Sequence, residues 1–265
     1  MNLDEYARMY AAEDKHWWYV GMRETTLGLL NGHLQPRGST LPKVSEPSGG
    51  YEETRRPRIL DAGCGTGGLL ARLSEEGWAV GVDLSATALG WAQRRTLPNL
   101  GLASVESLPF RDGVFDLVTC IDVLYHLQVH EDMTALREFR RVLRPGGYLL
   151  VKVPAFEALR GQHDKTVHTH HRYRLSEMCA KLQASGFRVE RATYANTLLL
   201  PAAATKRFLE NVFPLAAEGT SDVQMPPAWL NTILTHILLL EARLVREVNL
   251  PVGVSAIALA QRIPE

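Results

Sequence analysis

The chain has 265 residues, of which 29 are Lys or Arg, 29 are Asp or Glu, and 46% are hydrophobic. This length suits one large α/β domain or two smaller ones, with enough residues to bury a sizeable core. The balanced charge argues against a strongly basic nucleic-acid binder, and the composition is globular rather than disordered.

The first segment of the chain is predicted to be helical. Apolar and charged positions recur at helical spacing over residues 3–30, which predicts one or two helices ahead of the core. Residues 35–57 differ in composition, because prolines and glycines recur there among serines and charged residues. We predict a flexible linker over this stretch.

From residue 58 onward, short apolar strands alternate with helices. This alternation predicts a doubly wound α/β fold, in which a parallel sheet is covered by helices on both faces. Residues 58–265 form the predicted core, and residues 198–248 are a largely helical insertion before the last strand. The predicted strands are 58–61, 78–83, 101–105, 114–121, 148–153, 187–194 and 252–261, and the predicted helices between them are 66–76, 85–95, 134–143 and 176–185.

The sharpest local feature is a glycine-rich turn between the first predicted strand and its helix. In the run from Asp61 to Gly68, glycines let the backbone approach a ligand closely, and the helix start offers free N–H donors. Asp83 ends the next predicted strand, where a carboxylate can accept hydrogen bonds from both hydroxyls of a ribose. The pattern predicts a nucleotide-like ligand without saying which one, since Gly63, Gly65 and Gly68 also have dinucleotide-binding spacing.

Several motifs in order carry a resemblance to a known family. The chain resembles class I S-adenosylmethionine-dependent methyltransferases over residues 58–153, and a dehydrogenase would not need the later motifs. The resemblance implies a Rossmann-like, seven-stranded, mostly parallel sheet with an antiparallel last strand, and S-adenosyl-L-methionine as the cofactor. The matching segments are Asp61–Gly67, Gly81–Ser85, Leu108–Phe110 with Phe115–Val118, and Leu143–Gly147.

The resemblance also implies cofactor-binding roles residue by residue. Asp61 would hold the glycine turn or the cofactor's amino group, and Asp83 would bind the ribose hydroxyls. Many relatives carry Asp where Ser104 stands, and Ser104 can accept only a weaker bond from the adenine amino group. The other implied contacts are Gly63 and Gly65 with the methionine portion and ribose, Leu84 with adenine, the N–H of Val105 with the adenine ring, and the carbonyls of Cys120 and Ile121 with the amino group.

A candidate general base follows the fourth predicted strand. His126 lies in the segment Ile121–Leu127, and parallel sheets bind ligands beyond the carboxyl ends of their strands. A histidine with an ordinary pKa near ~6.5 suits proton removal at neutral pH. In similar small-molecule methyltransferases a His at this position often lines the substrate site. The alternative is a structural His126 that holds its loop through a ring N–H.

A second group of histidines follows the fifth predicted strand. Their spacing matches no standard zinc pattern and no Cys is near, so we predict no metal site. A substrate-facing loop, with His171 as a second catalytic candidate, is preferred to a solvated loop. Arg172 and Arg174 beside it would then favour an anionic group on the substrate. The histidines are His163, His168, His170 and His171.

The N-terminal segment contains two adjacent tryptophans in the run Lys15–Tyr19. Family members with a similar His-Trp-Trp stretch use their N-terminal helices as a lid on the cofactor. By this resemblance residues 1–34 would form a helical lid, with Trp18 covering the cofactor and Arg23 meeting its methionine carboxylate. The alternative is that both tryptophans anchor the core.

The insertion at residues 198–248 carries apolar residues at helical spacing. Core packing is the default interpretation. The functional alternatives are a hydrophobic substrate pocket, a dimer face or a helix on a membrane surface, although Lys and Arg are too few there to favour an anionic membrane.

The cysteines and the polar N-terminus indicate a cellular compartment. Cys64, Cys120 and Cys179 are far apart and predict no disulfide framework, which fits a reducing compartment. The start of the chain is too polar for a signal peptide, and the apolar stretch 233–240 is too short to span a membrane. We expect a cytoplasmic protein without a transmembrane segment.

The sequence therefore predicts a methyltransferase that acts on a small molecule. We favour O-methylation of a sugar, a lipid-like molecule or another natural product, on the grounds of the His126 candidate and the apolar cap. C- or N-methylation stays open, as do a nicotinamide-dependent oxidoreductase and a catalytically silent binding module. No nucleic-acid partner is expected. The sequence does not fix the oligomeric state, and it is compatible with a homodimer.

Overall fold

The computed structural model describes residues 3–33, 56–161, 164, 169–212 and 224–264. Most of the predicted linker, residues 35–57, therefore lies outside the described residues. The predicted N-terminal helices are α1 (Leu3–Ala12) and α2 (Trp17–Leu30). His16 caps α2, because its ring nitrogen Nδ1 accepts a hydrogen bond from the backbone N–H of Trp18 at 3.3 Å.

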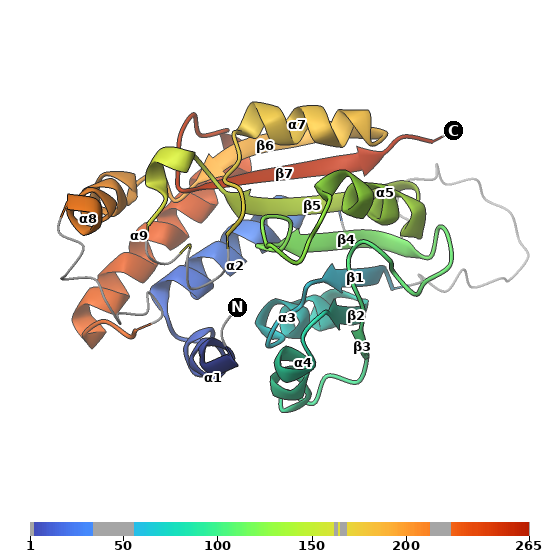
Figure 1. Ribbon diagram of the computed structural model, residues 1–265, viewed down its shortest axis with the longest axis horizontal. Helices are drawn as coiled ribbons and strands as arrows, with labels where there is room; N and C mark the ends of the chain where they lie inside the picture. Colours follow the sequence, from blue (N-terminus) through green and yellow to red (C-terminus); the bar gives the residue numbers. More distant parts are fainter. Residues whose placement is uncertain (1–2, 34–55, 162–163, 165–168, 213–223, 265) are drawn as a thin grey trace, which may run out of the picture.

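A seven-stranded sheet forms the centre of the molecule, in the order β3-β2-β1-β4-β5-β7-β6 (Figure 1). Neighbouring strands from β3 to β5 are parallel, and β7 is antiparallel to both β5 and β6. The predicted mostly parallel sheet with an antiparallel last strand is confirmed. The strands are β1 (Arg58–Ala62), β2 (Trp78–Asp83), β3 (Leu100–Leu102), β4 (Phe115–Ile121), β5 (Leu143–Pro154), β6 (Phe187–Ala195) and β7 (Ser255–Arg262).

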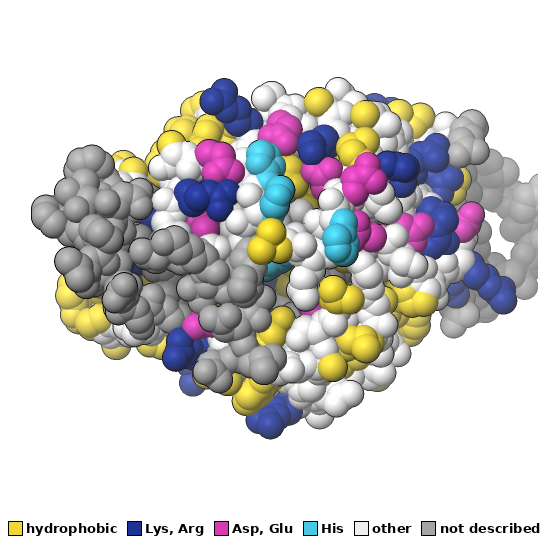
Figure 2. Space-filling view, viewed as in Figure 1, with side chains coloured by type: hydrophobic (Ala, Val, Ile, Leu, Met, Phe, Trp, Pro, Cys, Tyr) yellow, Lys and Arg dark blue, Asp and Glu magenta, His cyan; other side chains and the backbone are white. Residues whose placement is uncertain are grey.

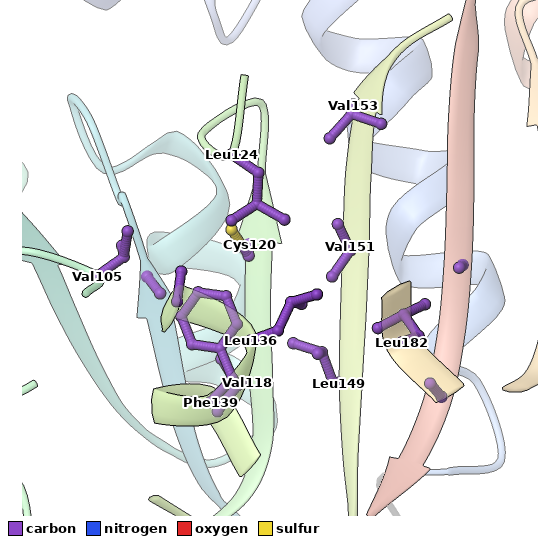
Figure 3. Packing of buried hydrophobic residues seen from close by; sticks show 14 of the residues in the cluster. Val105, Val118, Cys120, Leu124, Leu136, Phe139, Leu149, Val151, Val153 and Leu182 are labelled. Carbon is purple, nitrogen blue, oxygen red and sulfur yellow. The ribbon is translucent and has the colours of Figure 1, made fainter. Parts of the chain in front are cut away.

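Helices cover both faces of the sheet. On one face α5 and α7 pack on a buried cluster that includes Phe139, Leu136 and Leu182 (Figure 3). On the other face α2, α3, α4 and α9 contribute to a second cluster with strand residues such as Ile59 and Leu150. The helices are α3 (Gly68–Glu76), α4 (Ala86–Gln93), α5 (Asp132–Val142), α7 (Leu175–Ala184), α8 (Leu200–Val212) and α9 (Ala228–Glu247), and a short 3₁₀ turn, η1, spans Glu157–Leu159.

The last predicted strand, 252–261, begins only at Ser255, and further differences from the predicted bounds occur at β3 and β5. β3 is only three residues long, because the chain turns at Ser104, whose hydroxyl accepts a hydrogen bond from the N–H of Glu106 at 3.2 Å. β5 begins at Leu143, upstream of the prediction, because Leu143 already pairs with Phe115 of β4 ahead of the Pro-Gly-Gly run, in which Gly146 has a φ angle of +74°. The register shifts between Phe115 and Leu117, which accommodates the additional residues as a bulge.

The predicted helical insertion contains α8 and α9, separated by residues that the structure does not describe. α9 lies alongside α2 (Figure 1) and buries Leu238, Glu241, Ala242 and Val245. Its opposite side exposes Trp229, Ile233, Leu240 and Leu244, so only one face of α9 packs on the core. By length and composition α9 could also cross a membrane, a test that core helices of soluble proteins pass too. The expected lack of a transmembrane segment stays a prediction.

Candidate active site

A pocket of about 280 Å³ opens where strands β1 to β5 end at their carboxyl edge. Parallel sheets bind ligands at this edge, at the point where the strand order reverses. In this sheet that switch point lies between β1 and β4. Helices α1 and α2 form the opposite wall of the same pocket. The predicted site residues that line it are Trp18, Arg23, Asp61, Gly63, Gly65, Asp83, Leu84, Ser104, Val105, Ile121 and His126.

The glycine turn between β1 and α3 needs its glycines for two reasons. Gly63 and Gly65 have φ angles of +86° and +54°, which residues with a side chain rarely adopt. A Cβ atom on Gly63 would also lie only 2.1 Å from Cγ2 of Val123, so the turn and the chain after β4 approach closely there. The turn is anchored to β2, since the N–H groups of Gly63 and Cys64 donate to the carbonyl of Val82.

Asp83 lies at the end of β2 and points into the turn. Its Oδ2 accepts a hydrogen bond from the N–H of Gly65 at 2.9 Å, and its Oδ1 accepts one from the N–H of Ser85 at 2.8 Å. Burial raises the pKa of this carboxyl above its ordinary value, against the lowering effect of these bonds. A carboxylate has about four acceptor positions, so both oxygens retain capacity for a ligand's hydroxyl groups.

Asp61, at the end of β1, is buried beneath the turn. Its Oδ1 accepts a hydrogen bond from the hydroxyl of Thr119 at 2.8 Å. Desolvation by burial, reinforced by the nearby charges of Asp83 and Glu13, raises the pKa of Asp61 from 3.8 to about 7. This carboxyl therefore changes its charge near neutral pH, at a position that faces the pocket.

The N-terminal helices are attached to the glycine turn by a buried charged cluster. Glu13, which follows α1, accepts hydrogen bonds from the hydroxyl of Thr66 at 2.7 Å and from Nη2 of Arg95 at 2.6 Å. Arg95 also donates to the carbonyl of Thr66 at 3.0 Å and pairs with Asp14. On the α9 side, Asn231 accepts from the N–H of Trp17, which fixes the start of α2. These contacts hold α1 and α2 over the pocket.

Arg23 and Trp18 reach the pocket from α2. Nη1 of Arg23 donates to the carbonyl of Glu13 at 3.1 Å and lies 3.6 Å from Asp14. Its Nε is buried and has no hydrogen-bond partner within the described part of the chain. A buried N–H of this kind is satisfied by a ligand with an acceptor oxygen. The centre of the Trp18 ring lies 5.6 Å from Nζ of Lys152.

Lys152 and Asp122 form a charged pair where β5 and β4 end. Lys152 is on β5 and its side chain is 1% exposed, while the side chain of Asp122 is 36% exposed. The ammonium donates to Oδ2 of Asp122, and the N–H of Asp122 donates to the carbonyl of Lys152 at 2.9 Å. Asp122 has a φ angle of +57°. Both residues line the pocket.

His126 lies in the same half of the pocket, in the loop after β4. Its ring stacks on Tyr125, with the ring centroids 4.5 Å apart. Tyr125 is buried, and burial together with the charge of Asp122 raises the pKa of its hydroxyl well above the ordinary value. The phenol of Tyr125 therefore stays protonated at neutral pH, and His126 and Asp122 are the proton-accepting side chains that the described residues place beside it.

Residues 60–151 match the family model of a methyltransferase domain. This match covers β1 to β5, and therefore every strand end that forms the pocket. The chain contains a class I methyltransferase domain.

Curated relatives match this methyltransferase domain over part of their length. A ubiquinone/menaquinone biosynthesis C-methyltransferase of Cronobacter sakazakii is 37% identical over 126 residues, which are 42% of this chain and 49% of the relative. A malonyl-[acyl-carrier protein] O-methyltransferase of Erwinia pyrifoliae is 40% identical over 95 residues, which are 35% of this chain and 36% of the relative. The chain thus spans about a third to a half of these relatives' length.

Solved structures share the fold of the methyltransferase domain and of its additions. A Haloferax volcanii protein in complex with the Trm112 methyltransferase activator superposes with a TM-score of 0.59 at 18% identity, covering 99% of this chain and 96% of that one. An S-adenosylmethionine-dependent methyltransferase of Thermotoga maritima gives a TM-score of 0.56 at 17% identity, covering 98% and 95%. At this identity the likeness concerns the fold alone.

Two predicted site residues lie outside the pocket of the methyltransferase domain. Nε2 of His171 lies 2.9 Å from Oε1 of Glu177, and the ring packs edge-on against Tyr173 at 4.5 Å, so the ring is held away from the pocket lining. The side chain of Cys120 is buried in the cluster below α5 (Figure 3), and Cys120 does not line the pocket. Its neighbour Ile121 does line it.

The predicted substrate-facing loop around His171 has a different structural role where it is described. Arg172 is buried and donates hydrogen bonds to Asp164 at 2.8 Å and to the carbonyl of Ala155 at 2.7 Å. Its positive charge is therefore paired within the loop. His163 and His168 lie outside the described residues. Across the described positions, no group of three or more His, Cys, Asp or Glu side chains is placed to hold a metal ion.

Sequence reasoning missed several residues that line the pocket. A lysine within the apolar run of β5 was the available signal for Lys152, since a buried strand rarely carries a charge without a partner. Glu13 gave no such signal, because an acidic residue after a surface helix is ordinary. The missed lining residues include Glu5, Tyr6, Glu13, Asp122, Tyr125 and Lys152.

Proposed function

We propose that the chain is an S-adenosyl-L-methionine-dependent methyltransferase that acts on a small-molecule acceptor, with O-methylation favoured. The charge of the pocket carries this proposal. Among the described residues, two cations, Arg23 and Lys152, line the pocket with five carboxylates, which are those of Glu5, Glu13, Asp61, Asp83 and Asp122. A ligand that brings its own positive charge suits such a surface.

The carboxylates differ in how far their charge is offset by the protein. Glu5, Glu13 and Asp122 pair with Arg8, Arg95 and Lys152 respectively. Asp61 and Asp83, in contrast, take hydrogen bonds from uncharged donors. The sulfonium and ammonium groups of S-adenosylmethionine would supply the opposite charge here, whereas the diphosphate of a nicotinamide dinucleotide would add negative charge. This favours the methyltransferase over the oxidoreductase.

The residues of the glycine turn fit the remaining parts of S-adenosylmethionine. Asp83 has acceptor capacity for the two ribose hydroxyls, and Leu84, Ser104 and Val105 line the adenine end. The buried Nε of Arg23 fits the methionine carboxylate. When bound, S-adenosylmethionine supplies a methyl group on a positively charged sulfur. The domain then has to hold the acceptor in line with that methyl group and to exclude water.

The acceptor half of the pocket lies beyond β4 and β5. His126 and Asp122 can each contact an acceptor and take its proton, which supports O-methylation. The relatives named above include both a C- and an O-methyltransferase, so they do not favour one acceptor atom. C- or N-methylation is the second candidate within the same pocket, since it needs the same in-line placement.

Further features bear on the partners and the compartment. Basic and acidic side chains intermingle among the described residues on the face in Figure 2, so no broad basic surface supports nucleic-acid binding there. Each of the three cysteines is a free thiol, which supports a reducing, cytoplasmic compartment. The exposed apolar side of α9 is compatible with a homodimer.

Calorimetric titration tests the proposed cofactor. We expect S-adenosylmethionine and S-adenosylhomocysteine to bind the purified chain with micromolar affinity, and NADH not to bind. Binding of NADH alone would favour the oxidoreductase. S-adenosylhomocysteine binding without methyl transfer to any acceptor in a broad screen would favour the silent binding module.

A further inference from the structure

The charged pair of Lys152 and Asp122 lies apart from the residues that fit the cofactor. The glycine turn, Asp83 and Ser104 follow β1, β2 and β3, on one side of the sheet's switch point. Asp122 follows β4, and Lys152 of β5 pairs with Ile121 of β4. Both residues therefore lie on the other side of the switch point. A pocket that runs along this edge therefore presents the pair to whatever lies beyond the cofactor.

A structural role accounts poorly for this pair. Lys152 is among the largest fully buried side chains of the described structure, within a strand of apolar residues. Burying a charge beside its partner gains little stability over well-packed apolar residues, because the ammonium of Lys152 loses its water. Asp122 also has a positive φ angle, a conformation that costs free energy outside glycine and is concentrated at functional sites.

The charges of the pair select the kind of group that fits against it. Because the pair carries no net charge, the attraction of a carboxylate to Lys152 is opposed by its repulsion from Asp122, and an ammonium meets the reverse. A neutral hydroxyl satisfies both, since it can donate to the carboxylate and accept from the ammonium at once. The ammonium has three N–H donors and Asp122 takes one, so donors remain for a ligand.

The walls around the pair narrow the class of hydroxyl compound further. The aromatic residues Trp18, Tyr19 and Tyr125 line the same pocket, and Trp18 lies over the ammonium of Lys152. Aromatic walls suit a planar, conjugated ring. A carboxylate is a weak base, so it assists only a hydroxyl that is itself fairly acidic. Phenols and enols meet both conditions, and aliphatic alcohols do not.

We propose that Lys152 and Asp122 bind the hydroxyl group of a phenol or enol acceptor and prepare it for methylation. This inference rests on the proposed function and names the acceptor class of the same pocket. The hydroxyl proton goes to the carboxylate of Asp122, and the Lys152 ammonium faces the negative charge that develops on the oxygen. That oxygen forms its bond to the methyl carbon as the carbon–sulfur bond breaks, with the electron pair of that bond left on sulfur.

Matched aromatic probes test the acceptor class. The chain is first saturated with S-adenosylhomocysteine and then titrated with 2-naphthol, 2-naphthoate and 2-naphthylmethylamine, each followed by its fluorescence. These probes share one ring system and differ in the polar group. We expect 2-naphthol to bind about tenfold or more tightly than the anionic and cationic probes. When S-adenosylmethionine replaces S-adenosylhomocysteine in the assay, 2-naphthol should be converted to 2-methoxynaphthalene.

Variants of the pair assign the preference to these residues. Lys152→Met and Asp122→Asn each remove one charge at similar volume, and Asn tolerates the positive φ angle of residue 122. We expect each to weaken 2-naphthol binding by about tenfold while S-adenosylhomocysteine binding is kept. Lys181→Met is the matched control, because Lys181 pairs with Asp132 beside the Tyr173 ring but outside the pocket. It should leave 2-naphthol binding unchanged.

The outcomes separate this inference from the proposed function. Should the wild-type chain fail to bind S-adenosylhomocysteine, the proposed function fails and the inference with it. If S-adenosylhomocysteine binds but 2-naphthol does not bind, or 2-naphthol binds no better than 2-naphthoate, the inference alone is wrong. Unchanged 2-naphthol affinity in both Lys152→Met and Asp122→Asn would also overturn it. If Lys152→Met does not fold, Asp122→Asn and the double variant decide the question.

Discussion

Replacing Asp61 with asparagine should stabilise the chain without ligand, although Asp61 lies in the motif that identifies the domain. Raising the pKa of Asp61 from 3.8 to about 7 costs about 4 kcal/mol of folding free energy at a pH above both values. Asn keeps the shape and can still accept from Thr119, but it has no charge to desolvate. Because the amide also has buried N–H groups, we expect a net gain of about 2 kcal/mol.

The dependence on pH makes this prediction specific. Between pH values of about 4 and 7 the folded chain holds a proton on Asp61 that the unfolded chain has released, so its stability falls as the pH rises. The advantage of Asp61→Asn should therefore grow by about 3 kcal/mol from pH 5 to pH 8, or about 5 °C in melting temperature. Thermal melts of both proteins in one buffer series measure it. An equal or lower melting temperature for Asp61→Asn at pH 8, or a gap that does not change with pH, would refute the reasoning.

Three other variants test separate parts of the site. Asp83→Asn should weaken S-adenosylhomocysteine binding about 100-fold in calorimetry, through the loss of charge-assisted bonds to the ribose, and unchanged affinity would remove Asp83 from the cofactor site. Glu13→Gln should weaken the same binding about tenfold and speed hydrogen exchange in α1, because it breaks the pair with Arg95, whereas Arg8→Met on the outside of α1 should do neither. His126→Ala should raise the KM for a phenolic acceptor with a loss in kcat below about tenfold, and a loss of 10² or more would make His126, rather than Asp122, the base.

The sequence was sufficient for the sheet and for the pocket-lining residues that follow β1 and β2. Strands β1, β2 and β4 are apolar runs closed by glycine or polar residues, and such local patterns survive folding with little change. Gly63, Gly65 and Asp83 were predicted together because their roles depend on positions close in the chain. Ser104 ended β3 early, since a side-chain bond to the backbone of Glu106 competes with strand pairing.

The acceptor half could not be predicted in the same way. Lys152 and Asp122 are 30 residues apart and meet because β4 and β5 pair in register, which no local pattern reveals. Glu13 acts through Thr66 and Arg95, which belong to two other elements. His171 shows the converse error, because a histidine-rich loop suggested chemistry while its ring instead contacts Glu177 and Tyr173.

Hydrogen–deuterium exchange with and without S-adenosylhomocysteine tests the central claim most directly, namely that the cofactor binds across the ends of β1 to β3 under the N-terminal helices. The account predicts slower exchange in peptides that contain Asp61–Gly68, Asp83–Ala86 and helices α1 and α2. Protection that is absent there, or that gathers instead around the arginine-lined hollow of Arg137, Arg140, Arg141 and Arg262, would contradict it.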